Sequence, residues 1–311
     1  MKGKDYTVLL YYKYLPVENP DKLRDDHRAI CSANNLKGRI ITAYEGINGT
    51  VEGKTEDVET YVKWIKSQEG FSDVHFKYSE GDGKTFPKLS VKHRSEIVAG
   101  RLGDWDVKPW ETTGKYLTPE ELHTWIKSGK KFYFVDMRNT YEHEVGHFKD
   151  SIFAPMHTFT DLPNVLPLLE HIDPEDPIVT VCTGGVRCEK ASGFLVKSGF
   201  KNVFQLYGGI VSYMEAYPGE DFLGALYTFD QRIIMAFNTE EEGRTVIGKC
   251  KNCGEPSEQY TNCADPFCNR HYIACEKCIG NGKIKCPMGC RDYSKEHPEA
   301  FQWNAESPQS I

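Results

Sequence analysis

The sequence of 311 residues predicts a multidomain protein, with an α+β domain first, an α/β domain second and a small cysteine-rich domain last. Two observations predict this class. The order of strand-like and helix-like segments changes near residue 104, and eight of the eleven cysteines fall between Cys250 and Cys290. A chain of this length can hold two or three hydrophobic cores. We expect domains at 1–103, 117–223 and 224–295, a linker at 104–116 and a polar tail at 296–311.

The first hundred residues read as strand, helix, strand, strand, helix, strand, with one further strand. Strands are predicted at 6–15, 39–44, 50–52, 74–78 and 89–98, and helices at 20–34 and 55–68. In the second helix, Val58, Val62 and Ile65 recur at the spacing of one buried face. Asn48-Gly49 is the strongest short-range hairpin signal, so the tight turn is expected there, with a substrate-binding loop as the alternative. This order is typical of a ferredoxin-like, acylphosphatase-like domain.

The second domain alternates helices with short apolar strands. Thr118 and Pro119 mark a helix start, with threonine as the N-cap and proline in the first turn. Strands are predicted at 132–136, 178–181 and 203–206, with helical stretches between them. Strands connected through helices form a mainly parallel sheet, and such folds place ligand sites at the carboxyl ends of the strands.

A cysteine loop, Cys182-Thr-Gly-Gly-Val-Arg187-Cys188, follows the strand at 178–181 and leads into a helix. Its glycines let backbone N–H groups turn inward, and Arg187 adds a fixed positive charge. A helix N-terminus with such amides stabilises a thiolate and binds anions. We therefore predict that Cys182 is a nucleophile and that Arg187 assists it. The active-site loop is completed by Thr183, Gly184, Gly185, Val186 and Cys188.

Several neighbouring residues allow more than one interpretation. Four residues separate Cys182 from Arg187, whereas tyrosine-phosphatase-like loops use five, so the smaller ring argues against a phosphate monoester substrate. Cys188 either orders the turn or acts as a resolving thiol that could pair with Cys182. Three residues near the loop are predicted to form a structural ion-pair cluster, with a direct part in the reaction as the alternative: Asp136, Arg138 and Glu142.

The segment His143-Glu-Val-Gly-His147 spells the HExxH signature of zinc proteases. That signature requires both histidines on one face of a sustained helix. Gly146 weakens a helix here and the following residues do not continue it. We therefore interpret the segment from His143 to His147 as structural and do not expect a protease site.

The C-terminal cysteines form four closely spaced pairs that predict a metal-binding domain. They are Cys250 and Cys253, Cys263 and Cys268, Cys275 and Cys278, and Cys286 and Cys290. Eight sulfurs are enough for two structural zinc sites, each closed by four thiolates. An iron–sulfur cluster is the alternative, and His271 is a possible substitute ligand. The sequence shows no dinucleotide-binding glycine motif or haem-attachment signature, so neither flavin nor haem is expected.

The charge distribution limits how a nucleic acid could be bound. The net charge is −7, so such a partner would need a local basic patch. Residues 249–295 carry eight basic against five acidic residues, with tyrosines interleaved, and residues 75–101 carry six against three. The second excess is either a solvated basic surface or part of an RNA-binding patch. It comprises Lys77, Lys84, Lys88, Lys92, Arg94 and Arg101. With neither a long apolar run nor a signal peptide, we expect a cytoplasmic protein without a membrane partner.

The middle segment resembles a rhodanese domain in Asp136-Met-Arg138, Gly146-His147, the cysteine loop and Leu206-Tyr-Gly-Gly209. The whole architecture, with Glu45-Gly-Ile-Asn-Gly-Thr50 in the first domain, resembles the bacterial tRNA uridine 5-hydroxylases. That resemblance implies conversion of the wobble uridine, position 34, of tRNA to 5-hydroxyuridine, with molecular oxygen as co-substrate and Cys182 as the catalytic residue. It is also compatible with a monomer.

Two other functions are considered. The loop chemistry alone would suit a rhodanese-type sulfurtransferase that carries a persulfide, acting on thiosulfate or in tRNA thiolation. A sulfur-sensing or scaffold protein is the third possibility, but inactive rhodanese modules usually lose the cysteine or the arginine, and both are present here.

Overall fold

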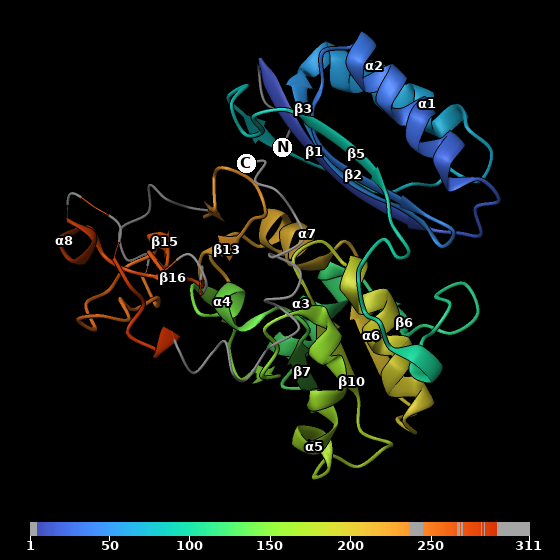
Figure 1. Cartoon of the computed structure of the whole chain (residues 1–311). Helices are drawn as coiled ribbons and strands as arrows, with labels where there is room; N and C mark the ends of the chain where they lie inside the picture. The colour runs from blue at the N-terminus through green and yellow to red at the C-terminus, as the bar shows by residue number, and fades with distance from the viewer. Residues whose placement is uncertain are drawn as a thin grey trace.

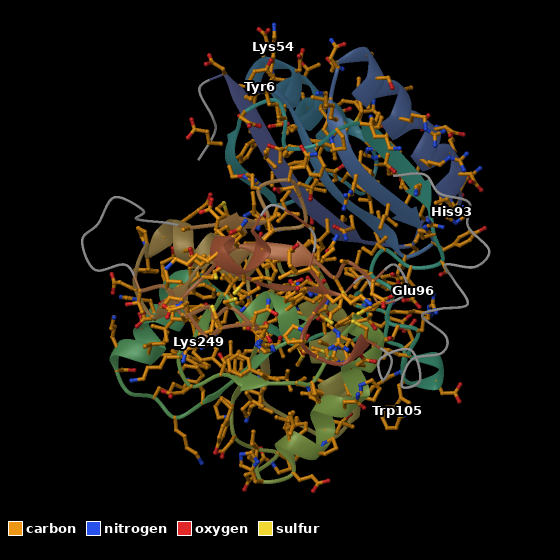
Figure 2. The ribbon with its side chains drawn as sticks, turned by 60° about the vertical axis from the view of Figure 1, so that its left-hand side comes forward. Tyr6, Lys54, His93, Glu96, Trp105 and Lys249 are labelled. Carbon is orange, nitrogen blue, oxygen red and sulfur yellow. The ribbon has the colours of Figure 1, made fainter. Side chains whose placement is uncertain are left out.

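The computed structural model describes residues 5–236, 245–265, 268, 270–280, 282 and 284–290. The tail expected at 296–311 lies outside these residues. Figure 1 shows the N-terminal domain above the second domain, with the cysteine-rich segment beside the second domain. In the turned view of Figure 2, Glu96 and Trp105 mark the connection that runs from the first domain down along the second.

The N-terminal domain is a five-stranded sheet with two helices over one face (Figure 1). The strand order is β4-β1-β3-β2-β5, and only β5 runs parallel to its neighbour. This confirms the expected ferredoxin-like, acylphosphatase-like order. The elements are β1 (Tyr6–Tyr14), α1 (Pro20–Ala33), β2 (Lys37–Ala43), β3 (Gly46–Lys54), α2 (Thr55–Ser67), β4 (Phe76–Gly81) and β5 (Leu89–His93).

The prediction that the hairpin turn lies at Asn48-Gly49 is wrong. Ala43 pairs with Gly46, so the turn is Tyr44-Glu45, and Asn48-Gly49 lies inside β3. A Cβ at Gly49 would lie 2.5 Å from the Tyr11 hydroxyl oxygen. Glycine is therefore required at 49 by the close approach of this ring, and not by a turn.

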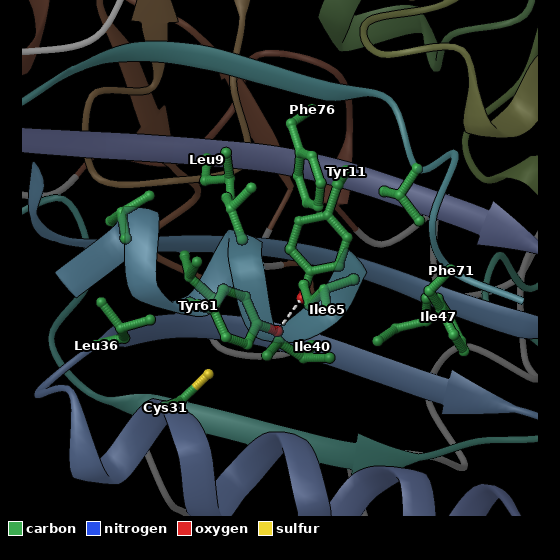
Figure 3. Close-up of a cluster of buried hydrophobic side chains, with 14 of the residues drawn as sticks. Leu9, Tyr11, Cys31, Leu36, Ile40, Ile47, Tyr61, Ile65, Phe71 and Phe76 are labelled. Carbon is green, nitrogen blue, oxygen red and sulfur yellow. Dashed lines mark hydrogen bonds between the residues drawn. The ribbon is translucent and has the colours of Figure 1, made fainter. Parts of the chain in front are cut away.

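The face of the sheet beneath the helices is filled by apolar side chains (Figure 3). Leu9 and Tyr11 of β1 pack here against Ile65 of α2. At the centre the Tyr11 hydroxyl lies 2.5 Å from the hydroxyl of Tyr61. Because side chains alternate along a strand, Leu10 points to the opposite face, which is turned toward the second domain.

The second domain has a parallel sheet in the order β6-β11-β10-β7-β9, which confirms the predicted class. The N-cap of its first helix is confirmed as well, because Thr118 and Glu121 form a capping box. The elements are β6 (Lys115–Leu117), α3 (Pro119–Lys127), β7 (Tyr133–Asp136), α4 (Thr140–His143), β8 (Gly146–Phe148), β9 (Ile152–Phe153), α5 (Leu166–Leu169), β10 (Ile178–Val181), α6 (Val186–Lys197), β11 (Val203–Leu206) and α7 (Gly209–Ala216), with 3-10 turns at η1 (Gly103–Trp105) and η2 (Phe159–Val165).

The chain beyond α7 folds back on the second domain. Strand β12 (Phe222–Gly224) pairs with β8, and the described remainder contains β13 (Leu226–Tyr227), β14 (Ile234–Met235), β15 (Tyr260–Asn262), β16 (His271–Ile273) and α8 (Glu276–Ile279). The Tyr260 hydroxyl donates to the carbonyl of Tyr141, which joins the cysteine-rich segment to α4. Among the described residues, the helices are all too short or too polar to cross a bilayer.

The structure agrees with the prediction that His143 and His147 do not form the zinc site of a protease. Helix α4 ends at His143 and β8 begins at Gly146, so the two histidines lie on different elements. The ring of His147 bonds through Nδ1 to the carbonyl oxygen of His143, at 2.8 Å. The His147 ring is therefore held by a hydrogen bond to the backbone of His143.

Candidate functional site

A cavity of about 400 Å³ lies between the free face of the N-terminal sheet and the cysteine loop. The N-terminal domain contributes Tyr12, Asn48 and Lys77 to its lining, the loop contributes Cys182, and the segment after α7 contributes Arg232. The site is thus built by segments from across the chain. Sequence reasoning placed the catalytic residues in the second domain alone, considered Asn48-Gly49 of the first domain only as an alternative substrate loop, and missed Tyr12 and Lys77. The available signal was the alternation in β1, which leaves Leu10 and Tyr12 on a face that the two helices do not cover.

Cys182 lies at the carboxyl end of β10, just before helix α6, as the sequence predicted. The backbone N–H of Gly185 donates to its Sγ at 3.2 Å. Burial by itself would raise the pKa of the Cys182 thiol, but the Cys188 thiol, the charge of Arg187 and backbone amides lower it to about 6. Cys182 is therefore a thiolate at neutral pH, the form that attacks electrophiles.

The guanidinium of Arg187 acts on Cys182 through its charge alone, because it binds Glu142, whereas the backbone N–H of Arg187 stabilises the sulfur by a hydrogen bond. Nη1 lies 2.5 Å from Oε1 and Nη2 lies 2.8 Å from Oε2, in a bidentate pair buried beside the loop. This pair ties the cysteine loop to α4. The guanidinium is therefore paired and is not free to bind an anion.

The structure divides the predicted ion-pair cluster into two separate pairs. Arg138 binds Asp136, with Nη2 2.6 Å from Oδ2, and both side chains are fully buried. Arg138 also donates to the carbonyl of Gly146 at 2.7 Å. Glu142 belongs to the Arg187 pair instead. The first pair thus supports the strand end, whereas the second supports the loop.

Cys188 is buried in the first turn of α6. Its N–H donates to the carbonyl of Gly185 at 3.0 Å, a contact that closes the turn. Burial and the hydrogen bond to Cys182 raise the pKa of the Cys188 thiol, so it donates while Cys182 carries the charge. These contacts fit the turn-ordering role, and the adjacency to Cys182 also fits the resolving role.

The two loop glycines lie against the N-terminal domain. A Cβ at Gly184 would lie 2.8 Å from the side chain of Leu10, and a Cβ at Gly185 would lie 2.8 Å from the Tyr12 hydroxyl. Gly185 also has a φ of +97°, which favours glycine. Tyr12 donates in turn to Oε1 of Glu189 at 2.9 Å. Strand β1 therefore packs directly on the loop that carries Cys182.

The eight C-terminal cysteines form two groups, each able to hold a metal ion. The first group is Cys250, Cys253, Cys275 and Cys278, and the second is Cys263, Cys268, Cys286 and Cys290. Within each group the sulfurs lie within 4.8 Å of one another. The pairs alternate between the groups along the chain, an arrangement that spacing alone could not specify.

The sulfur–sulfur distances fit a single ion in each group. Four thiolates at about 2.3 Å from a tetrahedral zinc lie about 3.8 Å apart. The Sγ atoms of Cys253 and Cys275 are 3.6 Å apart, and those of Cys268 and Cys286 are 3.7 Å apart. An iron–sulfur cluster would spread the cysteines further, because its iron and sulfide atoms occupy the centre. His271 stacks on Tyr260 instead and belongs to neither group.

Comparison with known proteins covers nearly the whole chain. Family models match for a UPF0176 acylphosphatase like domain at residues 6–97, a rhodanese-like domain at 118–216 and a rhodanase C-terminal segment at 223–291. Among solved structures, a rhodanese-like domain from Anabaena sp. is 18% identical and covers 36% of this chain and 80% of that chain, with a TM-score of 0.31.

Curated relatives match at much higher identity, and each is named tRNA uridine(34) hydroxylase. The relative from Bacillus cytotoxicus is 41% identical over 301 residues, covering 94% of this chain and 92% of that protein. The relative from Staphylococcus haemolyticus is 44% identical over 309 residues, covering 96% of this chain and 95% of that protein. This chain therefore belongs to the tRNA uridine(34) hydroxylase family.

Proposed function

We propose that the protein converts the wobble uridine, position 34, of tRNA to 5-hydroxyuridine in the cytoplasm, with molecular oxygen as co-substrate. The observation that carries this proposal is the Cys182 thiolate facing a cavity that the N-terminal domain closes. The relatives that share this architecture support the choice of substrate and reaction.

In this proposal Cys182 is the catalytic nucleophile and Arg187 stabilises its thiolate. Addition of Sγ to C6 of uracil would place electron density on C5, the atom that receives oxygen. A persulfide or sulfenate on Cys182 is the alternative form of the reactive sulfur. The loop residues Thr183, Gly184, Gly185 and Val186 shape the site, and the pairs of Asp136, Arg138 and Glu142 support it.

The cavity lining favours a planar base over a small anion. Leu10, Ile41 and Ile97 contribute apolar surface to it, which suits a nucleobase. Thiosulfate is a dianion, and the guanidinium of Arg187, the cation of the cysteine loop, is already paired with Glu142. These observations favour the hydroxylase over the sulfurtransferase.

We further propose that each cysteine group holds one structural zinc ion. Bound zinc would supply folding free energy to this segment, in which the buried cluster contains cysteines, Tyr272 and Ala274 but few large apolar side chains. The folded segment would then help to bind tRNA.

Nucleoside mass spectrometry of tRNA from a strain lacking the gene tests the function. The hydroxylase proposal expects position 34 to lose an oxygen atom relative to the parent strain, with thiolated nucleosides unchanged. Loss of a sulfur atom, with 5-hydroxyuridine intact, would replace the proposal with the sulfurtransferase.

A further inference from the structure

Lys77 is a buried cation that the reaction outlined above does not use. It lies in β4 opposite Leu10 of β1, on the face of the sheet that meets the cysteine loop. The side chain is only 3% exposed, yet it lines the cavity with Cys182. It therefore does not belong to a solvated basic surface, the interpretation that the sequence allowed for residues 75–101.

Three successive contacts connect the Lys77 ammonium to the active loop. Its Nζ lies 4.6 Å from the centre of the Tyr12 ring. The hydroxyl of that ring packs against Gly185, where a Cβ would lie only 2.8 Å away. Gly185 donates its N–H to Cys182 Sγ. The ammonium is thus held over the loop by an aromatic face, which fixes a cation without neutralising it.

The other cations of the cavity are occupied or exposed. Arg187 is paired with Glu142, and Arg232 is paired with Asp230, with Nη2 2.6 Å from Oδ2. Arg39 is exposed and donates to a backbone carbonyl. Lys77, in contrast, makes no ion pair with any carboxylate in the described part of the chain.

An ammonium buried in this way is costly to keep charged. Burial lowers the pKa of Lys77 to about 8, although the negative charges of Cys182, Glu189 and Glu215 act in the opposite direction. Cys182 lies in the loop, Glu189 in α6 and Glu215 in α7. His75, two residues before Lys77 in the sequence, is also close enough to interact with the ammonium. Such a group has free hydrogen-bond donors facing the space where substrate binds.

We propose that Lys77 is a further catalytic residue, whose ammonium donates a hydrogen bond to a carbonyl oxygen of the target uracil. The inference rests on the proposed function, with Cys182 adding at C6. In that step the Sγ–C6 bond forms, the C5=C6 π bond breaks, and the electron pair spreads over C5, C4 and O4. The negative charge leaves sulfur and arrives on O4, where the Lys77 ammonium stabilises it while keeping its proton.

This role can be measured without oxygen. In deuterium oxide under anaerobic conditions, the adduct takes up a deuteron at C5, loses the original proton and expels Cys182 Sγ. The enzyme therefore exchanges the C5 hydrogen of uridine 34 with solvent, and no oxidant or reductant is consumed. Digestion of the tRNA and nucleoside mass spectrometry give the exchange rate.

The decisive variant is Lys77→Met, which keeps the length of the side chain and removes its charge. We expect the exchange rate to fall by about a hundredfold or more, the size of effect seen when one donor to a developing oxyanion is removed. The affinity for tRNA should stay the same, because the hydrogen bond from Lys77 strengthens only as negative charge develops on O4. Lys77→Arg keeps the charge and should recover part of the rate. Lys63→Met removes an exposed lysine from α2 of the same domain and should match the wild type.

Three results separate the inference from the function on which it rests. If wild-type protein forms 5-hydroxyuridine and exchanges C5, but Lys77→Met exchanges at the wild-type rate, Lys77 has no catalytic role. If Lys77→Met loses exchange only in proportion to weaker tRNA binding, the residue is a binding residue and the proposal is overturned. If the wild type forms no 5-hydroxyuridine at all, the proposed function itself fails.

Discussion

Glu45 Oε2 lies 2.8 Å from Nζ of Lys190, and this ion pair joins the two domains beside the cysteine loop. Glu45 begins the segment that ends at Thr50, and Lys190 follows Cys188 and Glu189 in α6. The Lys190 side chain is fully buried. Burial alone would lower its pKa, but the hydrogen bond and charge of Glu45 raise it. The two motifs on which the family resemblance depended are therefore in contact.

Replacing Lys190 by methionine should strongly destabilise the interface between the domains. Glu45 and Asp106, whose Oδ1 lies 3.2 Å from Lys190 Nζ, would lose their shared cation. Breaking a buried pair from one side costs about 3–5 kcal/mol. Urea unfolding of Lys190→Met against wild type measures the change. Lys201→Met, which removes an exposed lysine paired with Glu175, should cost at most about 1 kcal/mol. Equal unfolding midpoints for Lys190→Met and wild type would show that the pair does not hold the domains.

Arg187→Ala should raise the pKa of Cys182 above about 6, because the positive charge is lost and Glu142 is left beside the loop. The thiolate fraction then rises at higher pH, so the midpoint of alkylation rate against pH should move upward. Alkylation resolved by peptide mass spectrometry measures this, with Cys31 as an internal control, because burial raises the pKa of its thiol to about 12. An unchanged midpoint would assign the activation to the loop amides.

Cys188→Ser should retain most of the hydroxylation. Serine keeps a hydrogen-bond donor to the Cys182 sulfur, and the N–H that closes the turn on Gly185 is unaffected. The yield of 5-hydroxyuridine in tRNA incubated with each variant is the measurement. A Cys188→Ser protein as inactive as Cys182→Ser would instead identify the two cysteines as a redox pair.

Cys275→Ser should remove zinc from the first cysteine group and unfold the C-terminal segment, because metal binding supplies on the order of 10 kcal/mol per structural site in small zinc domains. Metal analysis should find two zinc ions per wild-type chain and fewer in the variant, with weaker tRNA binding. Alkylation of Cys182 should be unchanged, since that residue lies in another domain.

Cys31→Ala, which alters a cysteine outside both groups, should keep both metal ions. Iron with labile sulfide in the wild type would contradict the zinc assignment and would place a redox centre in the C-terminal segment.

The sequence was sufficient for local features and for the domain order, but not for contacts between domains. Spacing predicted the thiolate loop because a strand, two glycines and a helix start act over a few residues. Asn48-Gly49 was misread because the ring of Tyr11, distant in sequence, imposes the glycine. Lys77 looked like one charge of a basic surface, since only the packing of β4 on the loop shows its burial. The division of the cysteines into groups likewise depends on how the segment folds.

Complementation tests whether Cys182 carries out wobble-uridine hydroxylation. A strain lacking the gene receives either the wild-type gene or Cys182→Ser, both expressed to equal levels of folded protein, and the nucleoside at position 34 is measured by mass spectrometry. We predict that the wild type restores 5-hydroxyuridine and that Cys182→Ser does not, because one oxygen replaces the reactive sulfur while the fold is kept. Restoration of 5-hydroxyuridine by Cys182→Ser would contradict the assignment of Cys182 as the catalytic residue.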